Sequence, residues 1–81
     1  MTVKMYTLST CSHCKSAKRF MEKHSVEHEF TDVDLLTGDI RKNTLNEIRQ
    51  YNPACSFPTI LVDETVVIGF NEKRLSELLG L

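Results

Sequence analysis

The chain has 81 residues, of which 41% are hydrophobic and 26% are charged, and its formal net charge at pH 7 is −1. This length suits one compact domain spanning residues 1–81, and the composition is that of a folded protein rather than a disordered tail. The near balance of acidic and basic residues gives no electrostatic reason to expect nucleic acid or an anionic membrane as a partner. No apolar run approaches the roughly 20 residues of a membrane-spanning helix, and no signal peptide is recognisable, so we expect a cytoplasmic monomer.

The first part of the chain predicts a strand–helix–strand unit. Residues Val3–Leu8 form a short apolar run that predicts a buried strand. Residues Ser12 to His24 predict an amphipathic helix. The apolar side chains of Ala17, Phe20 and Met21, with His24 next, recur along it at intervals of three and four. Residues Val26–Val33 alternate between two sets of side chains and predict the second strand. A helix that joins two strands in this way requires them to be parallel.

The second part predicts a helix, a hairpin and a final helix. The Thr37-Gly38-Asp39 segment offers turn and cap residues before a helix over Ile40–Tyr51, with Leu45 and Ile48 as core contacts. The Asn52-Pro53 pair ends that helix, because proline cannot continue it. Two runs rich in β-branched residues then follow, separated only by Asp63-Glu64, so they predict an antiparallel hairpin: Thr59–Val62 and Thr65–Ile68.

The last helix carries its own boundary signals. Asn71 is a good N-cap, and Gly80 is placed to end the helix. Phe70 and Leu75 have the spacing of a hydrophobic staple across the helix start. The complete order is β-α-β-α-β-β-α, which predicts an α/β domain with a four-stranded mixed sheet flanked by helices.

Three cysteines are an odd number and too few for a secreted disulfide scaffold. Cys11 and Cys14 form a C-x-x-C motif at the junction between the first strand and the first helix, where this spacing is typical of redox catalysis. One helical turn brings the two sulfurs within reach of a disulfide. The helix N-terminus favours a thiolate on Cys11, so we expect Cys11 to attack and the more interior Cys14 to resolve.

Two basic residues accompany the motif. An imidazole at His13, between the cysteines, would stabilise the thiolate and make the disulfide more oxidising than a proline there would. The alternative is a solvated histidine at a helix start, and Lys15 is more simply explained as a solvated helix charge.

The Phe57-Pro58-Thr59 segment places a proline directly at the start of the third strand, where it does not break the sheet. Together with the C-x-x-C after the first strand and Gly69 after the fourth, this arrangement resembles the glutaredoxin family over nearly the whole chain. The resemblance implies a thioredoxin-like fold and a cis Phe57–Pro58 bond, whereas spacing alone would favour trans. It also implies that the proline loop packs beside the active-site disulfide. The substrate-binding residues that it implies are Phe57, Pro58, Thr59, Gly69, Phe70 and Asn71.

The sequence also departs from the glutathione-dependent members of that family, which usually carry C-P-Y-C, a lysine two residues before the first cysteine, and Gly-Gly followed by acidic residues. Here the motif is C-S-H-C, Ser9 stands at the lysine position, and the later segment is Ile68-Gly69-Phe70-Asn71. The Gly69-Phe70 pair is closer to the small glutaredoxin-like proteins that take electrons from thioredoxin reductase and reduce ribonucleotide reductase. Thioredoxin reductase and glutathione therefore both stand as candidate electron donors. Asn71, besides capping its helix, could hold a peptide carboxylate.

The third cysteine and the histidines leave further alternatives. Cys55 could be a redox thiol or a metal ligand beside Cys11 and Cys14, but an inert, partly buried cysteine is the simpler explanation. His24 and His28 have no spacing that links them to the cysteines, and we expect them to be structural.

The sequence therefore predicts a dithiol–disulfide oxidoreductase that reduces protein or low-molecular-weight disulfides and binds no cofactor beyond its own redox-active disulfide. The alternative is a metal or iron–sulfur carrier that uses Cys11 and Cys14, with Cys55 or His13 as a further ligand or with a cluster shared between two chains. A single C-x-x-C supplies fewer ligands than the usual tetrahedral site.

Overall fold

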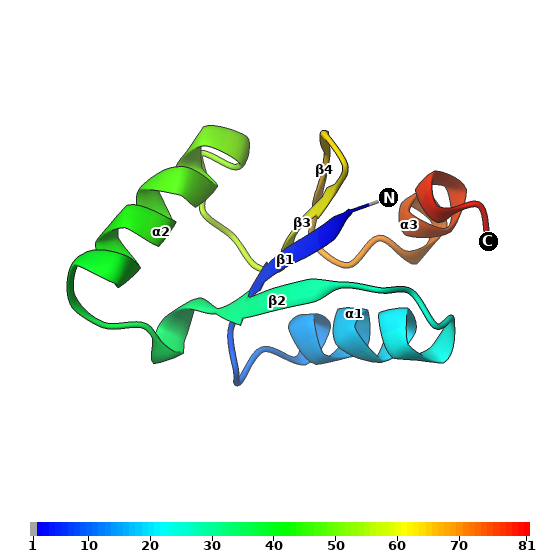
Figure 1. The fold of residues 1–81 in the computed structure, drawn as a ribbon, viewed down its shortest axis with the longest axis horizontal. Coiled ribbons are helices and arrows are strands. Elements are labelled where there is room, and N and C mark those ends of the chain that lie inside the picture. Colours follow the sequence, from blue (N-terminus) through cyan, green and yellow to red (C-terminus); the bar gives the residue numbers. More distant parts are fainter. Residues whose placement is uncertain (1) are drawn as a thin grey trace.

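The computed structural model describes residues 2–81. Its elements, in chain order, are β1 (Val3–Thr7), α1 (Ser12–Lys23), β2 (Glu29–Asp32), the 3-10 turn η1 (Val33–Leu35), α2 (Gly38–Tyr51), β3 (Thr59–Val62), β4 (Thr65–Ile68) and α3 (Glu72–Leu79). The sheet has the order β2-β1-β3-β4, in which β1 is parallel to β2 and antiparallel to β3, and β3 is antiparallel to β4. This confirms the predicted β-α-β-α-β-β-α order and the mixed four-stranded sheet (Figure 1).

The two faces of the sheet bury two different clusters, because neighbouring side chains on a strand point to opposite faces. On one face, Val3 and Met5 of β1 pack with the apolar stripes of α1 and α3, including Phe20 and Leu75. On the other face, Tyr6 packs with α2 and η1 through Ile48 and Val33. The end of β1 therefore lies between α1 on one face and α2 on the other, and the cysteines follow directly from it (Figure 1).

The predicted second strand, Val26–Val33, is wrong at both ends, because β2 spans only Glu29–Asp32. The amide of Val26 donates to the carbonyl of Met21 at 2.8 Å, so this segment closes α1 instead of pairing with β1. At the other end, Val33 turns into η1 and is buried against α2. The alternating pattern of side chains continues on both sides of β2, but the backbone there does not pair with β1.

Other boundaries shift by one or two residues. β1 ends at Thr7 rather than Leu8, because the Leu8 carbonyl accepts from the amide of Cys11 at 3.2 Å in the turn that follows. Lys23 is the last residue of α1, and His24 is its C-cap. α2 begins at Gly38, and the side chain of Thr37 makes no capping hydrogen bond.

The hairpin and the last helix form as predicted. Val62 pairs with Thr65, so Asp63 and Glu64 are the two turn residues, with Asp63 in the left-handed region at φ 53°. The side chain of Asn71 accepts from the amide of Arg74 at 3.0 Å, which confirms the N-cap of α3. Gly80 ends this helix in the left-handed conformation at φ 71°. Among residues 2–81, no helix combines the length and the apolar character needed to cross a membrane.

Candidate active site

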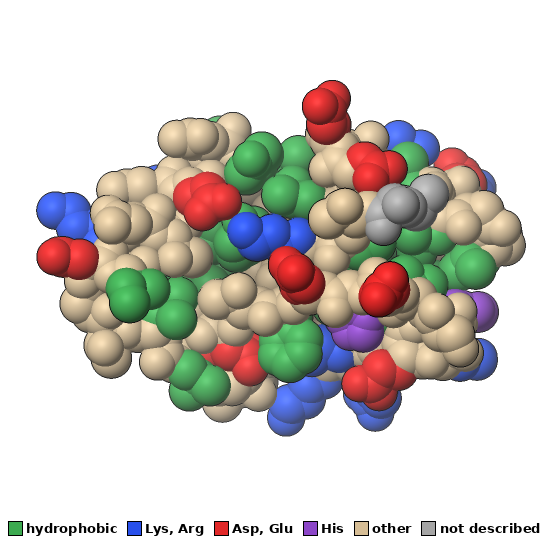
Figure 2. Space-filling model, viewed as in Figure 1, with side chains coloured by type: hydrophobic (Ala, Val, Ile, Leu, Met, Phe, Trp, Pro, Cys, Tyr) green, Lys and Arg blue, Asp and Glu red, His purple; other side chains and the backbone are tan. Residues whose placement is uncertain are grey.

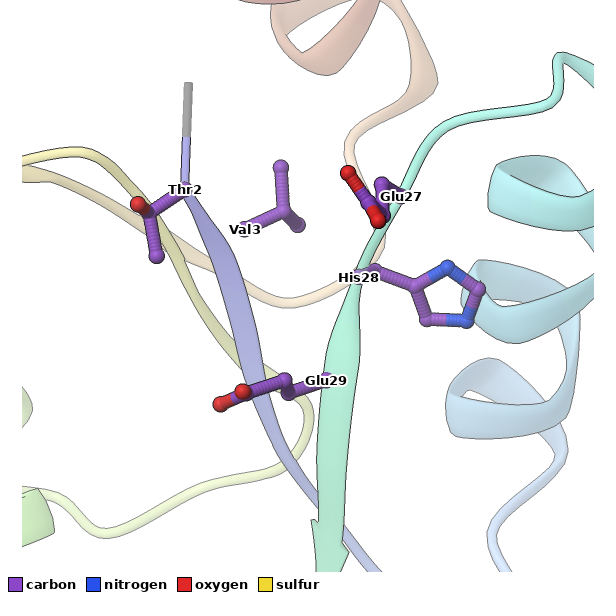
Figure 3. Close-up of a pocket in the computed structure, with 5 residues that line it drawn as sticks. All are labelled: Thr2, Val3, Glu27, His28 and Glu29. Carbon is purple, nitrogen blue, oxygen red and sulfur yellow. The ribbon is translucent and has the colours of Figure 1, made fainter.

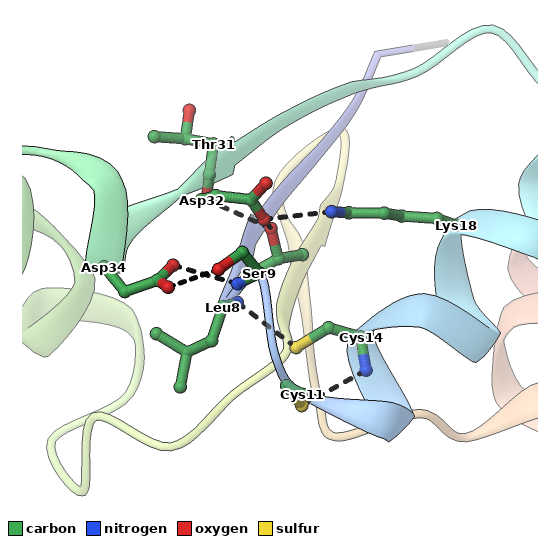
Figure 4. Close-up of polar contacts among 9 residues, drawn as sticks. Leu8, Ser9, Cys11, Cys14, Lys18, Thr31, Asp32 and Asp34 are labelled. Carbon is green, nitrogen blue, oxygen red and sulfur yellow. Dashed lines mark hydrogen bonds and ion pairs between the residues drawn. The ribbon is translucent and has the colours of Figure 1, made fainter.

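The two cysteines of the motif occupy different environments at the start of α1. Cys11 is the N-cap residue and is partly exposed, and its sulfur accepts a hydrogen bond from the amide of Cys14 at 3.2 Å (Figure 4). Cys14 is in the helix and its side chain has no exposed surface. None of the three cysteines takes part in a disulfide. Of the C-x-x-C pair, therefore, only Cys11 has exposed surface that a substrate can approach.

The buried sulfur of Cys14 is held by the backbone that directly follows β1. The backbone amide of Leu8 lies 3.5 Å from the Cys14 sulfur and donates to it (Figure 4). Burial, together with the neighbouring Cys11 sulfur, raises the pKa of Cys14 to about 12, although the Leu8 amide and the charge of Lys18 act in the opposite direction. In the dithiol form, Cys14 consequently keeps its proton at neutral pH.

The two basic residues of the motif face solvent. His13 and Lys15 are both exposed on the first turns of α1. The structure thus brings His13 to the same helical turn as the cysteines without burying its ring. This position permits an electrostatic effect on a nearby anion, but one that solvent weakens.

The proline loop lies at the start of β3. The Phe57–Pro58 bond is cis, as the resemblance implied. Pro58 is buried and Phe57 is partly exposed. The carbonyl of Pro58 accepts from the amide of Gly69 at 2.8 Å, and Gly69 adopts φ 80°, which a residue with a side chain rarely reaches. This bond fixes the end of β4 against the proline loop.

A buried asparagine that the sequence analysis did not single out holds the same loop. The Asn52 side-chain nitrogen donates to the carbonyl of Ser56 at 3.1 Å, its hydroxyl at 3.0 Å, and the hydroxyl of Thr59 at 3.1 Å. Thr59 in turn donates to the Ser56 carbonyl at 2.8 Å. Asn52 is only 2% exposed. The sequence signal at this position, an Asn before Pro53, indicated only a helix end.

This network bears on the predicted substrate-binding residues. The Thr59 side chain is fully buried and occupied by Asn52 and Ser56, so only its backbone remains for a substrate. The ring of Phe70 packs edge-on against Phe20, with ring centroids 5.8 Å apart, and therefore belongs to the core as well as to the loop.

A second group of contacts, also missed from the sequence, fixes the loop before Cys11. The amide and hydroxyl of Ser9 donate to the two carboxylate oxygens of Asp34 at 2.9 and 2.5 Å (Figure 4). These hydrogen bonds hold the pKa of Asp34 below its usual range. η1 is thereby tied to the turn that precedes Cys11. No periodicity links Ser9 with Asp34, because the contact joins two loops that meet only in the folded chain.

A partly buried ion pair lies between α1 and β2. Lys18 contacts Asp32 at 2.9 Å, and the Thr7 hydroxyl donates to the same carboxylate oxygen at 2.6 Å. Burial alone would raise the pKa of Asp32, but the hydrogen bonds from Thr7 and Lys18 outweigh it, so this pKa lies below its usual range. The Lys18 ammonium also lies 4.0 Å from the centre of the Phe30 ring, which shields one side of the pair.

The glutaredoxin family model matches residues 3–67, which include both cysteines of the C-x-x-C motif and the proline loop. The chain belongs to the glutaredoxin family. Among curated proteins it is similar to an uncharacterized glutaredoxin-like 8.6 kDa protein in the rubredoxin operon of Clostridium pasteurianum, with 26% identity over 95% of this chain and 96% of the relative.

Solved structures of glutaredoxins agree with this assignment and confirm the thioredoxin-like fold. The methanoredoxin of Methanosarcina acetivorans is 38% identical, with a TM-score of 0.93 over 99% of this chain and 85% of that one. The glutaredoxin of Methanosarcina mazei Go1 is 40% identical, with a TM-score of 0.89 over 99% of this chain and 79% of that one. The glutaredoxin grx-1 of Archaeoglobus fulgidus is 35% identical, with a TM-score of 0.90 over 95% of this chain and 84% of that one.

In this glutaredoxin the third cysteine packs as an apolar residue. Cys55 is partly buried against the cluster around Tyr6 and Ile48, and it adopts φ 51° in the loop after α2. Within residues 2–81 no group of three or more Cys, His, Asp or Glu side chains is arranged to hold a metal ion. Within the described residues the fold therefore does not gather Cys11, Cys14 and Cys55 into one such group.

The two remaining histidines have structural contacts. His24 lies against Phe20, with ring centroids 4.6 Å apart, and His28 makes a 2.8 Å hydrogen-bond contact with the carbonyl of Val26. His28 also lines an open hollow of about 300 Å³ with Thr2, Val3, Glu27 and Glu29 (Figure 3). Glu27 and His28 lie just before β2, and Glu29 begins it. Their side chains point in different directions in this view, with the His28 ring turned toward α1. The hollow lies at the start of β1, whereas the cysteines follow its end.

Proposed function

We propose that this glutaredoxin is a dithiol–disulfide oxidoreductase in which Cys11 is the nucleophile and Cys14 the resolving thiol. The observation that carries the proposal is the asymmetry of the pair. The Cys11 sulfur is accessible and receives the Cys14 amide at 3.2 Å, whereas Cys14 is fully buried with its pKa raised to about 12. An amide donor and a helix N-terminus stabilise an anion on sulfur, and the thiolate is the reactive species.

The reaction proceeds in two exchanges. The Cys11 thiolate attacks one sulfur of the substrate disulfide, so that bond breaks, a mixed disulfide forms, and the departing thiolate takes a proton from water. Cys14 then gives up its proton and attacks the Cys11 sulfur, which releases the second substrate thiol. The substrate disulfide is reduced to two thiols, and Cys11 and Cys14 are oxidised to an intramolecular disulfide.

The proline loop supports the docking of the substrate. Phe57 is partly exposed beside the buried cis-Pro58, and the buried Asn52 side chain holds the loop by its hydrogen bond to the Ser56 carbonyl. The substrate segment would lie along the backbone of Phe57, Pro58 and Thr59, with Gly69, Phe70 and Asn71 at the edge of the site. Asn71 marks the start of α3, where the first backbone amides of the helix would hold a peptide carboxylate while the Asn71 side chain caps Arg74.

Two electron donors fit this function. Glutathione is the ligand in a buckwheat glutaredoxin structure that is 10% identical, a level at which only the fold is shared. Because the glutathione signatures are missing around Ser9 and Gly69, we favour a thioredoxin reductase. The oxidised protein should be offered separately to glutathione with its reductase and to thioredoxin reductase. Efficient turnover with glutathione alone would reverse this choice.

The decisive experiment for the roles of the cysteines is to trap the mixed disulfide. Cys14→Ser should form a stable adduct with a disulfide substrate through Cys11, seen as a mass increase of one substrate thiol, and should lose dithiol turnover. Cys11→Ser should form no adduct. An adduct on Cys55 or turnover by Cys11→Ser would refute the assignment. Metal analysis and a visible spectrum of anaerobically purified protein test the competing cluster carrier shared between two chains.

A further inference from the structure

One flank of α2 carries a basic groove whose charge the chain itself does not neutralise. The groove has a volume of about 340 Å³ and is lined by Gly38, Arg41, Lys42, Leu45 and Arg49. In residues 2–81 none of its three cations forms an ion pair. The nearest acidic residue in sequence, Asp39, is exposed on the first turn of the same helix and makes no such pair with them either.

Of the seven other Lys and Arg residues in the described chain, three form ion pairs with carboxylates. Lys4 pairs with Glu47, Lys18 with Asp32, and Arg74 with Glu77. Glu47, the other acidic residue of α2, also accepts a 2.7 Å hydrogen bond from the Tyr6 hydroxyl and is thus directed away from the groove. A cluster of unpaired cations in a chain of net charge −1 is a local positive surface, which attracts an anion of complementary shape.

The floor of the groove connects it to the rim of the active site. Leu45 packs against the cluster around Tyr6 and Ile48, and the partly buried members of that cluster include Leu8 and Phe57. Leu8 directly precedes the Ser9–Cys11 turn, and Phe57 precedes the cis-proline. An extended peptide spans about 3.4 Å per residue. Substrate residues a few positions from the substrate's reacting cysteine can therefore extend past this shared cluster to the groove.

The surroundings of the groove fit a protein better than a small anion. Leu35 and Ile40, each 67% exposed, lie on either side of Gly38 along the chain. Hydrophobic side chains gather over η1 and the start of α2 on the face shown in Figure 2. Exposed apolar side chains beside a charged groove are typical of macromolecular interfaces, where they supply contact area that a small ion does not use.

Building on the proposed function, we propose that the Arg41–Lys42–Arg49 groove docks an acidic segment of the disulfide-bearing protein substrate. Acidic side chains within a few residues of the substrate cysteine enter the groove while the disulfide lies over Cys11. The contact selects among substrates by charge, and it acts mainly on the rate of association, because exposed charges steer encounter more than they hold a complex.

The test compares two disulfide-linked peptide dimers, one with Glu and one with Gln at positions two to five residues from the cysteine. The groove variant is Arg41→Gln/Lys42→Gln/Arg49→Gln. The control variant, Arg19→Gln/Lys23→Glu, lowers the net charge by the same three units on the exposed surface of α1. At low ionic strength the groove variant should lower kcat/KM for the acidic peptide about tenfold and leave the neutral peptide within about twofold, and added salt should remove the difference.

Each other result overturns the docking proposal. An equal loss in the control variant would assign the effect to net charge, and an equal loss with glutathione disulfide would assign the groove to a small anion. Unchanged discrimination between the two peptides in the groove variant would refute it directly. Binding is also measured by amide chemical shifts on Cys11→Ser/Cys14→Ser, titrated with the acidic segment without its cysteine. Chemical-shift changes at Gly38 and Arg41 in this titration support docking in the groove, whatever the turnover. A wild-type protein that turns over no disulfide would refute the proposed function but not the docking.

Discussion

The backbone amide of Leu8 donates a 3.5 Å hydrogen bond to the sulfur of Cys14, so the turn that follows β1 holds the buried thiol of the motif. Leu8 and Cys14 are six residues apart in the sequence, and the turn between them carries Cys11. One thiol is thereby fixed in the interior while the other stays at the surface. The difference in their exposure follows from this turn as much as from the residues themselves.

The redox role of His13 can be measured through the reduction potential. Replacing it in His13→Pro removes the imidazole between the cysteines, so the thiolate is less stabilised and the disulfide becomes less oxidising. We expect the potential to fall by about 30 mV, which corresponds to a tenfold change in the exchange equilibrium. The measurement is equilibration against glutathione buffers. His24→Gln, at the far end of α1, is the matched control, and an unchanged potential in His13→Pro would leave His13 as a solvated side chain only.

Asn52 should be essential for the stability of the proline loop. Asn52→Ala removes a fully used side-chain donor from a site that is 2% exposed, which leaves buried hydroxyl and carbonyl groups with fewer partners. We expect a loss of about 2–3 kcal/mol in the free energy of unfolding, measured by urea denaturation. Asn46→Ala, on the exposed surface of α2, should change it by less than about 0.5 kcal/mol. Equal effects of the two variants would contradict the role of Asn52.

The Lys18–Asp32 pair should make stability depend on pH. The pKa of Asp32 is lower in the folded chain than its ordinary value, so its contribution is present above that ordinary value and is lost as pH falls through the folded pKa. Asp32→Asn should therefore be less stable than wild type at pH 7 by about 1–2 kcal/mol, and the difference should shrink below about pH 4. Denaturation curves from pH 3 to 7 provide the measurement. Glu64→Gln in the exposed hairpin turn is the control, and a difference that stays constant with pH would argue against the pair.

Cys55 should be dispensable for catalysis. Its sulfur packs against the cluster around Tyr6 and shares no metal-type cluster with Cys11 and Cys14. We expect Cys55→Ser to keep kcat/KM within about twofold of wild type while Cys14→Ser loses dithiol turnover. Steady-state assays with one disulfide substrate compare the two variants. A large loss in Cys55→Ser, with an unchanged unfolding curve, would make it a third redox thiol.

Much of the fold follows from local patterns in the sequence. Helix faces, the Asn71 cap, the hairpin turn at Asp63-Glu64 and the order of elements each depend on residues that are close in sequence. The second strand was predicted too long because alternation reports which side a residue faces, whereas a strand also requires a paired neighbour. Val26 finds its partner in Met21 instead of in β1.

The sequence by itself determined the cysteine pair and its place at a strand–helix junction, because the spacing of Cys11 and Cys14 and the flanking periodicity are local properties. Only the tertiary structure decided how the site is supported. The bond from Ser9 to Asp34 joins two loops that meet only when the strand–helix–strand crossover closes, and no local pattern carries that information. The bonds from Asn52 to Thr59 and from Gly69 to Pro58 span shorter stretches, but they depend on how the loop after α2 enters the sheet.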